Sequence, residues 1–178
     1  KRSKRFIWGC RNMTILDICK EIDYLANHRV EIGILAIDRD KKGKENKATI
    51  LQYAIWNEFG TKYIPARPFM RNALDNNKEA ISKLIKNAVA DVAKGSIKGK
   101  EALMRIGEDI RGKVIVSIAT AGQWAVANAK NTLRIKTKNG QINNTKPLLD
   151  NRFLIKSIRY QIVDKNGSNI YLSEFKDV

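Results

Sequence analysis

Two adjoining segments with helical hydrophobic periodicity, in the middle of the chain, constrain the fold more than any other feature. The first ends at Gly95, and the second follows it directly. Their apolar residues recur every three or four positions, which places them on one stripe of an α-helix. Each stripe must be buried against another element of the fold. The stripe residues are Ile81, Leu84, Ile85, Ala88, Val89 and Val92 in the first helix and Leu103, Ile106, Ile110, Val114 and Ile118 in the second.

Two segments with alternating apolar residues can supply a partner for these stripes. Every second residue is apolar from Val30 to Ala36 and from Ile158 to Ile162, which is the periodicity of a β-strand. The length of 178 residues is enough to bury a core without a disulfide or a metal. We therefore predict an α+β fold in a single domain over residues 1–178, with an antiparallel sheet packed on one face by the two long amphipathic helices.

The N-terminal part of the chain combines a basic arm, a helix and a polar loop. Residues 1–13 begin with KRSKR, and we expect them to form a basic arm. Apolar residues at helical spacing predict a helix over 14–28, with Thr14 as its N-cap. Residues 38–47 contain no apolar side chain, so we expect a solvated, mobile loop there.

A glycine and two prolines define the next segment. The pattern over residues 49–59 predicts a short helix that ends at Gly60, because glycine readily adopts the left-handed backbone of a C-cap. Pro65 and Pro68 exclude a regular helix over residues 61–70, since proline lacks an amide donor and extends the residue before it. We expect this segment to be a stiff connector.

Positive charge dominates the composition and is concentrated in one stretch. The chain has 34 Lys and Arg against 18 Asp and Glu, a formal net charge of +16, and no acidic residue lies between Ile110 and Leu149. Within this stretch, alternation over residues 133–137 leads into Asn139-Gly140, a strong signal for a β-hairpin. We therefore predict a projecting basic hairpin, within a mobile loop over 128–146 that becomes ordered on assembly. The hairpin carries Arg134, Lys136 and Lys138.

The residue types that most catalytic and metal sites need are scarce. His28 is the one histidine in the sequence, and we expect it at the end of the first helix. Cys10 and Cys19 have no neighbouring ligands to complete a zinc site and are expected to be reduced thiols. No glycine-rich phosphate loop is present, and no apolar run approaches the roughly 18 residues of a membrane span. We therefore expect no enzyme, no cofactor or metal site, and no contact with a membrane.

The positive charge itself allows two interpretations. It can attract the phosphates of nucleic acid through counterion release, or acidic neighbours in an assembly. Trp124 is the one aromatic residue between positions 110 and 149, so stacking on single strands has little support. Sequence-independent contact with duplex phosphates therefore stays open beside a contact with protein.

The segment YAIWNEFGTKYIPARPFM, residues 53–70, resembles the hallmark of a phage protein family. In the tail-completion and neck family, which includes virion morphogenesis, minor tail and head-tail joining proteins, this segment contains HEFGT and IPARPF. Asn57 stands where many members carry His. Trp124, Asn131-Thr132-Leu133 and Pro147-Leu148-Leu149-Asp150 also resemble the family pattern, whereas Asn151-Arg152-Phe153 replaces its Thr-Gly-Arg. The resemblance spans about residues 30–163.

The resemblance implies a non-enzymatic structural protein of a tailed bacteriophage or prophage. Members form a ring, usually of six copies, where the tail meets the head and where DNA passes through the centre. The implied partners are other copies of the chain, the neighbouring head-connector and tail proteins, and packaged DNA. The implied location is the neck or tail of the virion, with the host cytoplasm as the place of assembly. The motif residues are Glu58, Phe59, Gly60, Thr61, Pro65, Arg67, Pro68 and Phe69.

In physical terms, the motif fits a structural role. Phe59 and Phe69 can serve as buried anchors, and Glu58 and Arg67 can form a buried ion pair across the turn. The basic hairpin then faces the DNA channel or grips an adjacent ring. The alternative function is that of a sequence-nonspecific double-stranded DNA-binding protein.

Overall fold

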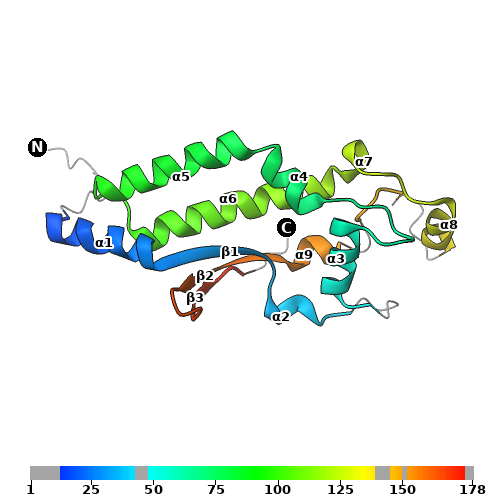
Figure 1. The fold of residues 1–178 in the computed structure, drawn as a ribbon, viewed down its shortest axis with the longest axis horizontal. Coiled ribbons are helices and arrows are strands. Elements are labelled where there is room, and N and C mark those ends of the chain that lie inside the picture. Colours follow the sequence, from blue (N-terminus) through cyan, green and yellow to red (C-terminus); the bar gives the residue numbers. More distant parts are fainter. Residues whose placement is uncertain (1–12, 43–47, 139–144, 150–151, 175–178) are drawn as a thin grey trace, which may run out of the picture.

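The long helix α6 (Gly99–Ala119) is the central element of the fold, and most of the other elements contact it (Figure 1). A computed structural model describes residues 13–42, 48–138, 145–149 and 152–174. The predicted arm over 1–13 lies outside these residues except for Met13. The two predicted long helices are confirmed as α5 (Lys78–Ala93) and α6. The predicted α5 stripe is wrong at Ile85 and Val89, which are 40% and 46% exposed. The shorter helices are α1 (Ile15–Asn27), α2 (Ala36–Arg39), α3 (Ile50–Phe59), α4 (Phe69–Asp75), α7 (Ala121–Trp124), α8 (Lys130–Lys138) and α9 (Phe153–Ser157).

A three-stranded antiparallel sheet lies against α6, as Figure 1 shows. Strands β1 (His28–Ile34) and β2 (Ile158–Asp164) pair along their whole length, and β3 (Asn169–Leu172) pairs with the other edge of β2. On the face toward α6, the Tyr160 ring lies directly beneath Gly107. The opposite face carries polar side chains, among which Gln161 donates a hydrogen bond to Glu31. The predicted α+β class is therefore confirmed. Of the two long helices predicted to cover the sheet, α6 packs on the strands, whereas α5 packs on α6 and α1.

Two hydrophobic clusters lie toward the two ends of α6. One joins α5 to the first half of α6, and the other joins the second half of α6 to α3, α4, α9 and the start of β2. The first cluster contains Ala88, Val92, Ile97, Ala102 and Ile106. The second contains Ala54, Phe69, Ala73, Val114, Ile118, Ala121, Leu148, Leu154 and Ile158. Trp124 packs against this second cluster.

Local signals at the helix ends agree with the structure. Thr14 caps α1, since its hydroxyl accepts a hydrogen bond from the Asp17 amide at 3.2 Å. At the other end of α1, the His28 ring nitrogen Nδ1 lies 2.7 Å from the Tyr24 carbonyl. Thr49 caps α3 in the same way as Thr14 caps α1. Among the described residues, no helix combines the length and apolar composition needed to cross a bilayer.

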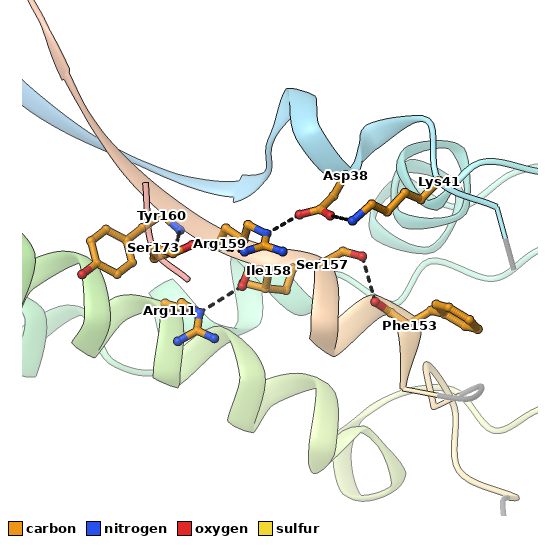
Figure 2. Close-up of polar contacts among 9 residues, drawn as sticks. All are labelled: Asp38, Lys41, Arg111, Phe153, Ser157, Ile158, Arg159, Tyr160 and Ser173. Atoms are coloured by element: carbon orange, nitrogen blue, oxygen red, sulfur yellow. Dashed lines mark hydrogen bonds and ion pairs between the residues drawn. The ribbon is translucent and has the colours of Figure 1, made fainter. Parts of the chain in front are cut away.

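The predicted solvated loop over 38–47 is wrong at its start, because Asp38 and Arg39 belong to α2 and Asp38 is buried. Asp38 lies in α2 with 2% of its surface exposed, and its carboxylate binds both Arg159 of β2 and Lys41, the latter at 2.5 Å (Figure 2). Burial raises the pKa of Asp38, but hydrogen bonds from Lys41 and Arg159 outweigh burial and hold this pKa below its usual value. The ion pairs therefore attach α2 to the sheet. Residues 43–47 of the predicted loop lie outside the described residues.

Two more buried polar side chains bind main-chain groups of β2, and Figure 2 shows both. Arg111 of α6 donates from Nε to the Ile158 carbonyl at 3.0 Å. The Ser173 hydroxyl accepts a hydrogen bond from the Tyr160 amide at 2.9 Å, just beyond the end of β3. Both contacts satisfy main-chain groups that burial would otherwise leave without a partner.

Two glycines of α6 provide a matched test of this packing. A Cβ at Gly107 would lie 2.3 Å from the Tyr160 ring, whereas a Cβ at Gly112 would meet no atom within 4 Å. We expect Gly107→Ala to lower the free energy of unfolding by about 1–3 kcal/mol through overpacking. Gly112→Ala is expected to raise it by about 0.5–1 kcal/mol, because alanine is the better helix former. Urea denaturation of both variants would measure these changes, and similar changes in both would contradict the described contact.

Asp38 should make stability depend on pH. Because its pKa is lowered on folding, Asp38 stabilises the protein above the pKa of the unfolded state, about 3.9, and this contribution disappears as the pH falls through the lower folded-state pKa. We expect Asp38→Asn to cost about 3 kcal/mol at pH 7, as for a broken buried ion pair. Denaturation curves from pH 7 to pH 2.5 should show the difference shrinking below about pH 4. A difference that stays constant over this range would exclude a charged Asp38.

Candidate functional site

The motif of residues 57–69 spans the end of α3, a non-helical connector (residues 61–68) and the first residue of α4. The predicted end of the helix at Gly60 is confirmed, but its C-cap is not left-handed helical, since Gly60 combines a φ of 76° with a ψ of 171°. Glycine is still required here, because φ is positive and a Cβ would lie 3.0 Å from the Ala66 amide. The Thr61 hydroxyl accepts a hydrogen bond from the Ile64 amide at 3.0 Å, which closes the next turn. The glycine and the threonine thus determine the path of the connector.

Glu58 holds the start of α4. Glu58 is 7% exposed, and its carboxylate accepts hydrogen bonds from the Met70 amide at 2.9 Å and the Arg71 amide at 3.1 Å. These are amides of the first turn of α4, which have no partner within the helix. The Arg71 side chain also donates to the Glu58 carboxylate at 3.1 Å and to the Glu58 carbonyl at 2.6 Å. A negative charge is favourable at this end of a helix.

Arg67 joins the connector to a segment far away in the sequence. It is 7% exposed and donates to the carbonyls of Val126 at 2.7 Å and Ala127 at 3.2 Å. Its third nitrogen lies 3.3 Å from the Asn57 amide oxygen. Burial lowers the pKa of Arg67, while Tyr53 acts in the opposite direction. Because Ala127 lies just before α8, Arg67 connects the motif to the base of that helix.

The structure corrects two expectations about the motif. Glu58 and Arg67 do not pair with each other, because amides of α4 and carbonyls of residues 126 and 127 already occupy them. Phe69 is a buried anchor as predicted, but Phe59 is 68% exposed. The helical spacing explains this difference, since Ala54, Asn57 and Glu58 form the buried face of α3.

Phe59 belongs to a group of exposed apolar side chains. Ile55, Trp56 and Phe59 lie on the face of α3 opposite its buried residues, and Tyr63, 85% exposed, lies in the turn that follows. We call these four residues the aromatic surface. The Arg71 guanidinium lies 5.2 Å from the centre of the Phe59 ring, so the residue that binds Glu58 also contacts Phe59. Contiguous exposed apolar groups are a common feature of surfaces that bind other proteins.

The predicted basic hairpin is wrong in its secondary structure. Residues 130–138 form the helix α8, and residues 139–144, which include the predicted turn, lie outside the described residues. The helix also replaces part of the predicted mobile loop over 128–146. Lys136 faces the body of the protein and donates hydrogen bonds to the carbonyls of Lys146 at 3.2 Å and Leu149 at 2.6 Å. Arg134 and Lys138 are exposed.

A cavity of about 510 Å³ lies between α8 and the ends of α6 and α7. Small and apolar side chains supply much of its lining, together with a few polar groups and Lys146. Its lining includes Ala119, Thr120, Gly122, Gln123, Ala125, Ala127, Asn128, Leu133, Thr145 and Pro147. Among the described residues, no group of three or more His, Cys, Asp or Glu side chains could hold a metal ion.

Sequence reasoning missed the partners of the motif's charged residues. Asn57 lies within the motif and Arg71 two residues after it, but no local pattern assigns them to Arg67 and Glu58. The carbonyls of Val126 and Ala127 belong to a segment about 60 residues away. A main-chain acceptor has no signature in the side-chain sequence.

No family model, curated protein sequence or solved structure matches this chain.

Replacing Arg67 should destabilise the connector and loosen α8. Arg67→Met keeps the length of the side chain but leaves two carbonyls without a donor, so we expect a loss of about 3 kcal/mol in the free energy of unfolding. Arg71→Met is the control, because Arg71 is half exposed and Glu58 keeps two amide donors; its expected loss is about 1 kcal/mol. Urea denaturation and hydrogen exchange would measure both variants. Equal losses, or unchanged exchange of the α8 amides in Arg67→Met, would contradict this role.

Proposed function

We propose that this protein is a non-enzymatic structural subunit of a tailed bacteriophage or prophage, which forms a ring at the junction of head and tail. Its partners are further copies of itself and the neighbouring head-connector and tail proteins. The protein then belongs to the neck or tail of the virion and assembles in the host cytoplasm. The resemblance of residues 53–70 to the tail-completion and neck family is the starting point for this proposal.

One structural observation carries the proposal. The charged residues of the motif, Glu58 and Arg67, are buried and bind main-chain groups. This observation supports a structural role, in which the two side chains stabilise the fold of the motif. The same fold leaves Phe59 exposed at the end of α3 and Tyr63 exposed in the turn that follows. Aromatic side chains are favourable for binding another protein, because they have few rotatable bonds to order on contact. We therefore assign the aromatic surface to a contact between subunits or with an adjacent ring protein.

The oligomeric state tests this proposal. We expect the purified protein to form a ring in solution or on mixing with its virion neighbours, with the mass measured by light scattering after size exclusion. The double variant Phe59→Ser/Tyr63→Ser should weaken this association at least tenfold, because exposed aromatic anchors contribute strongly to interfaces. The variant should keep the stability of the parent, since both side chains are already exposed.

A second double variant provides the control. Ile85→Ser/Val89→Ser removes two partly exposed apolar side chains from α5, outside the motif. We expect this variant to associate like the parent protein. Assembly that both variants weaken equally, or that neither affects, would contradict the assignment of the aromatic surface.

A further inference from the structure

Helix α8 places three cations along one exposed line. Lys130, Arg134 and Lys138 are four residues apart and all exposed. At 1.5 Å per residue, neighbouring positions are separated by about 6 Å along the helix, and the line extends for about 12 Å. The predicted hairpin would instead have grouped Lys136 with Arg134 and Lys138. The helix therefore creates a different charged surface, which we call the α8 basic face.

The opposite side of α8 attaches the helix to the rest of the protein. Leu133 lines the cavity beneath the helix, and Lys136 binds the carbonyls of Lys146 and Leu149. At the base of the helix, Arg67 binds the carbonyls of residues 126 and 127. These contacts turn the α8 basic face away from the body. In Figure 1, α8 lies at one end of the molecule, far from α1.

The cations of the α8 basic face lack acidic partners within the described part of the chain. Cations on α6 do have acidic partners, since Arg105, Arg111 and Lys113 each pair with an acidic residue three or four positions away. The sequence contains no Asp or Glu from residue 110 to residue 149. Lys130, Arg134 and Lys138 therefore carry their charge at the exposed surface, where a ligand from outside the molecule can contact it.

The character of this face favours a duplex over other anionic partners. Evenly spaced cations without an aromatic residue between them offer phosphate contacts and no platform on which single-stranded bases could stack. Ile135 is the one large apolar side chain exposed on the described α8, which is little for a protein interface, where buried aromatic anchors dominate. We propose that the α8 basic face binds the sugar-phosphate backbone of duplex DNA without reading its sequence.

Salt dependence tests this proposal. Each phosphate contact contributes about 0.9 to the slope of log K against log salt concentration. The triple variant Lys130→Gln/Arg134→Gln/Lys138→Gln should therefore reduce the slope by about 2.7. When the salt concentration rises from 50 to 200 mM, the factor by which the variant loses affinity should be about 40-fold smaller than that of the parent protein. Fluorescence anisotropy with a 30-base-pair duplex of arbitrary sequence would measure this change in the full chain.

A charge-matched variant separates this site from general attraction to a basic protein. Lys78→Gln/Lys83→Gln/Lys86→Gln removes three exposed lysines of α5 and changes the net charge by the same amount. We expect it to retain nearly the full slope. Equal slopes for the two triple variants would overturn the proposal. Tighter binding of the parent protein to polyglutamate than to the duplex would overturn it in favour of an acidic protein partner.

The DNA-binding test of α8 can fail or succeed independently of the test of the ring. DNA binding through α8 does not require assembly, so we expect Phe59→Ser/Tyr63→Ser to bind the duplex with a slope that still depends on the α8 cations. A parent protein that stays monomeric with its virion neighbours but shows this slope would contradict the ring and support the α8 site. A ring whose DNA affinity is unchanged in the α8 triple variant would contradict the α8 site alone.

Discussion

Buried charged side chains that bind main-chain groups hold together the parts of this protein that lack regular backbone hydrogen bonding. Arg67 supplies donors to two carbonyls before α8, and Glu58 supplies an acceptor to two amides at the start of α4. Arg111 donates a hydrogen bond to the Ile158 carbonyl at the start of β2, next to α9. Leaving such groups unpaired in a buried position costs about 1–3 kcal/mol each. The connector and the short helices can adopt their positions because these side chains provide the missing partners.

The elements that could be predicted from the sequence are those with a local cause. The stripes of α5 and α6, the alternation of β1 and β2, the Thr14 cap and the turn at Gly60 each depend on residues within one helix, strand or turn. The partners of Asp38, Glu58 and Arg67 depend on the tertiary arrangement, and Arg159 lies 121 residues from Asp38. Polarity alone placed Asp38 in a solvated loop, since a charge that is buried with its counter-ion looks the same in a sequence as one in water.

The incorrect prediction for residues 130–138 has a specific physical origin. Alternation from Leu133 to Thr137 suits a strand, but lysine, arginine and leucine are also good helix formers. In the helix, Leu133 and Lys136 share the side that contacts the body, whereas a strand would have placed them on opposite faces. Lys136 can lie on that side because the carbonyls of residues 146 and 149 accept hydrogen bonds from its ammonium group. A similar ambiguity affected Phe59, because one apolar residue at a helix end can lie on either face.

The position of Arg67 between the motif and α8 has a consequence for how the protein would meet its partners. Its guanidinium contacts the connector and the segment before α8 in the isolated chain. The orientation of α8 relative to the aromatic surface is therefore set when the chain folds. Conformational entropy lost during folding is not lost again on association, so a preorganised subunit binds more tightly than one that must order the same segments on contact. Each monomer thus carries the relative geometry of its two exposed surfaces before any partner is present.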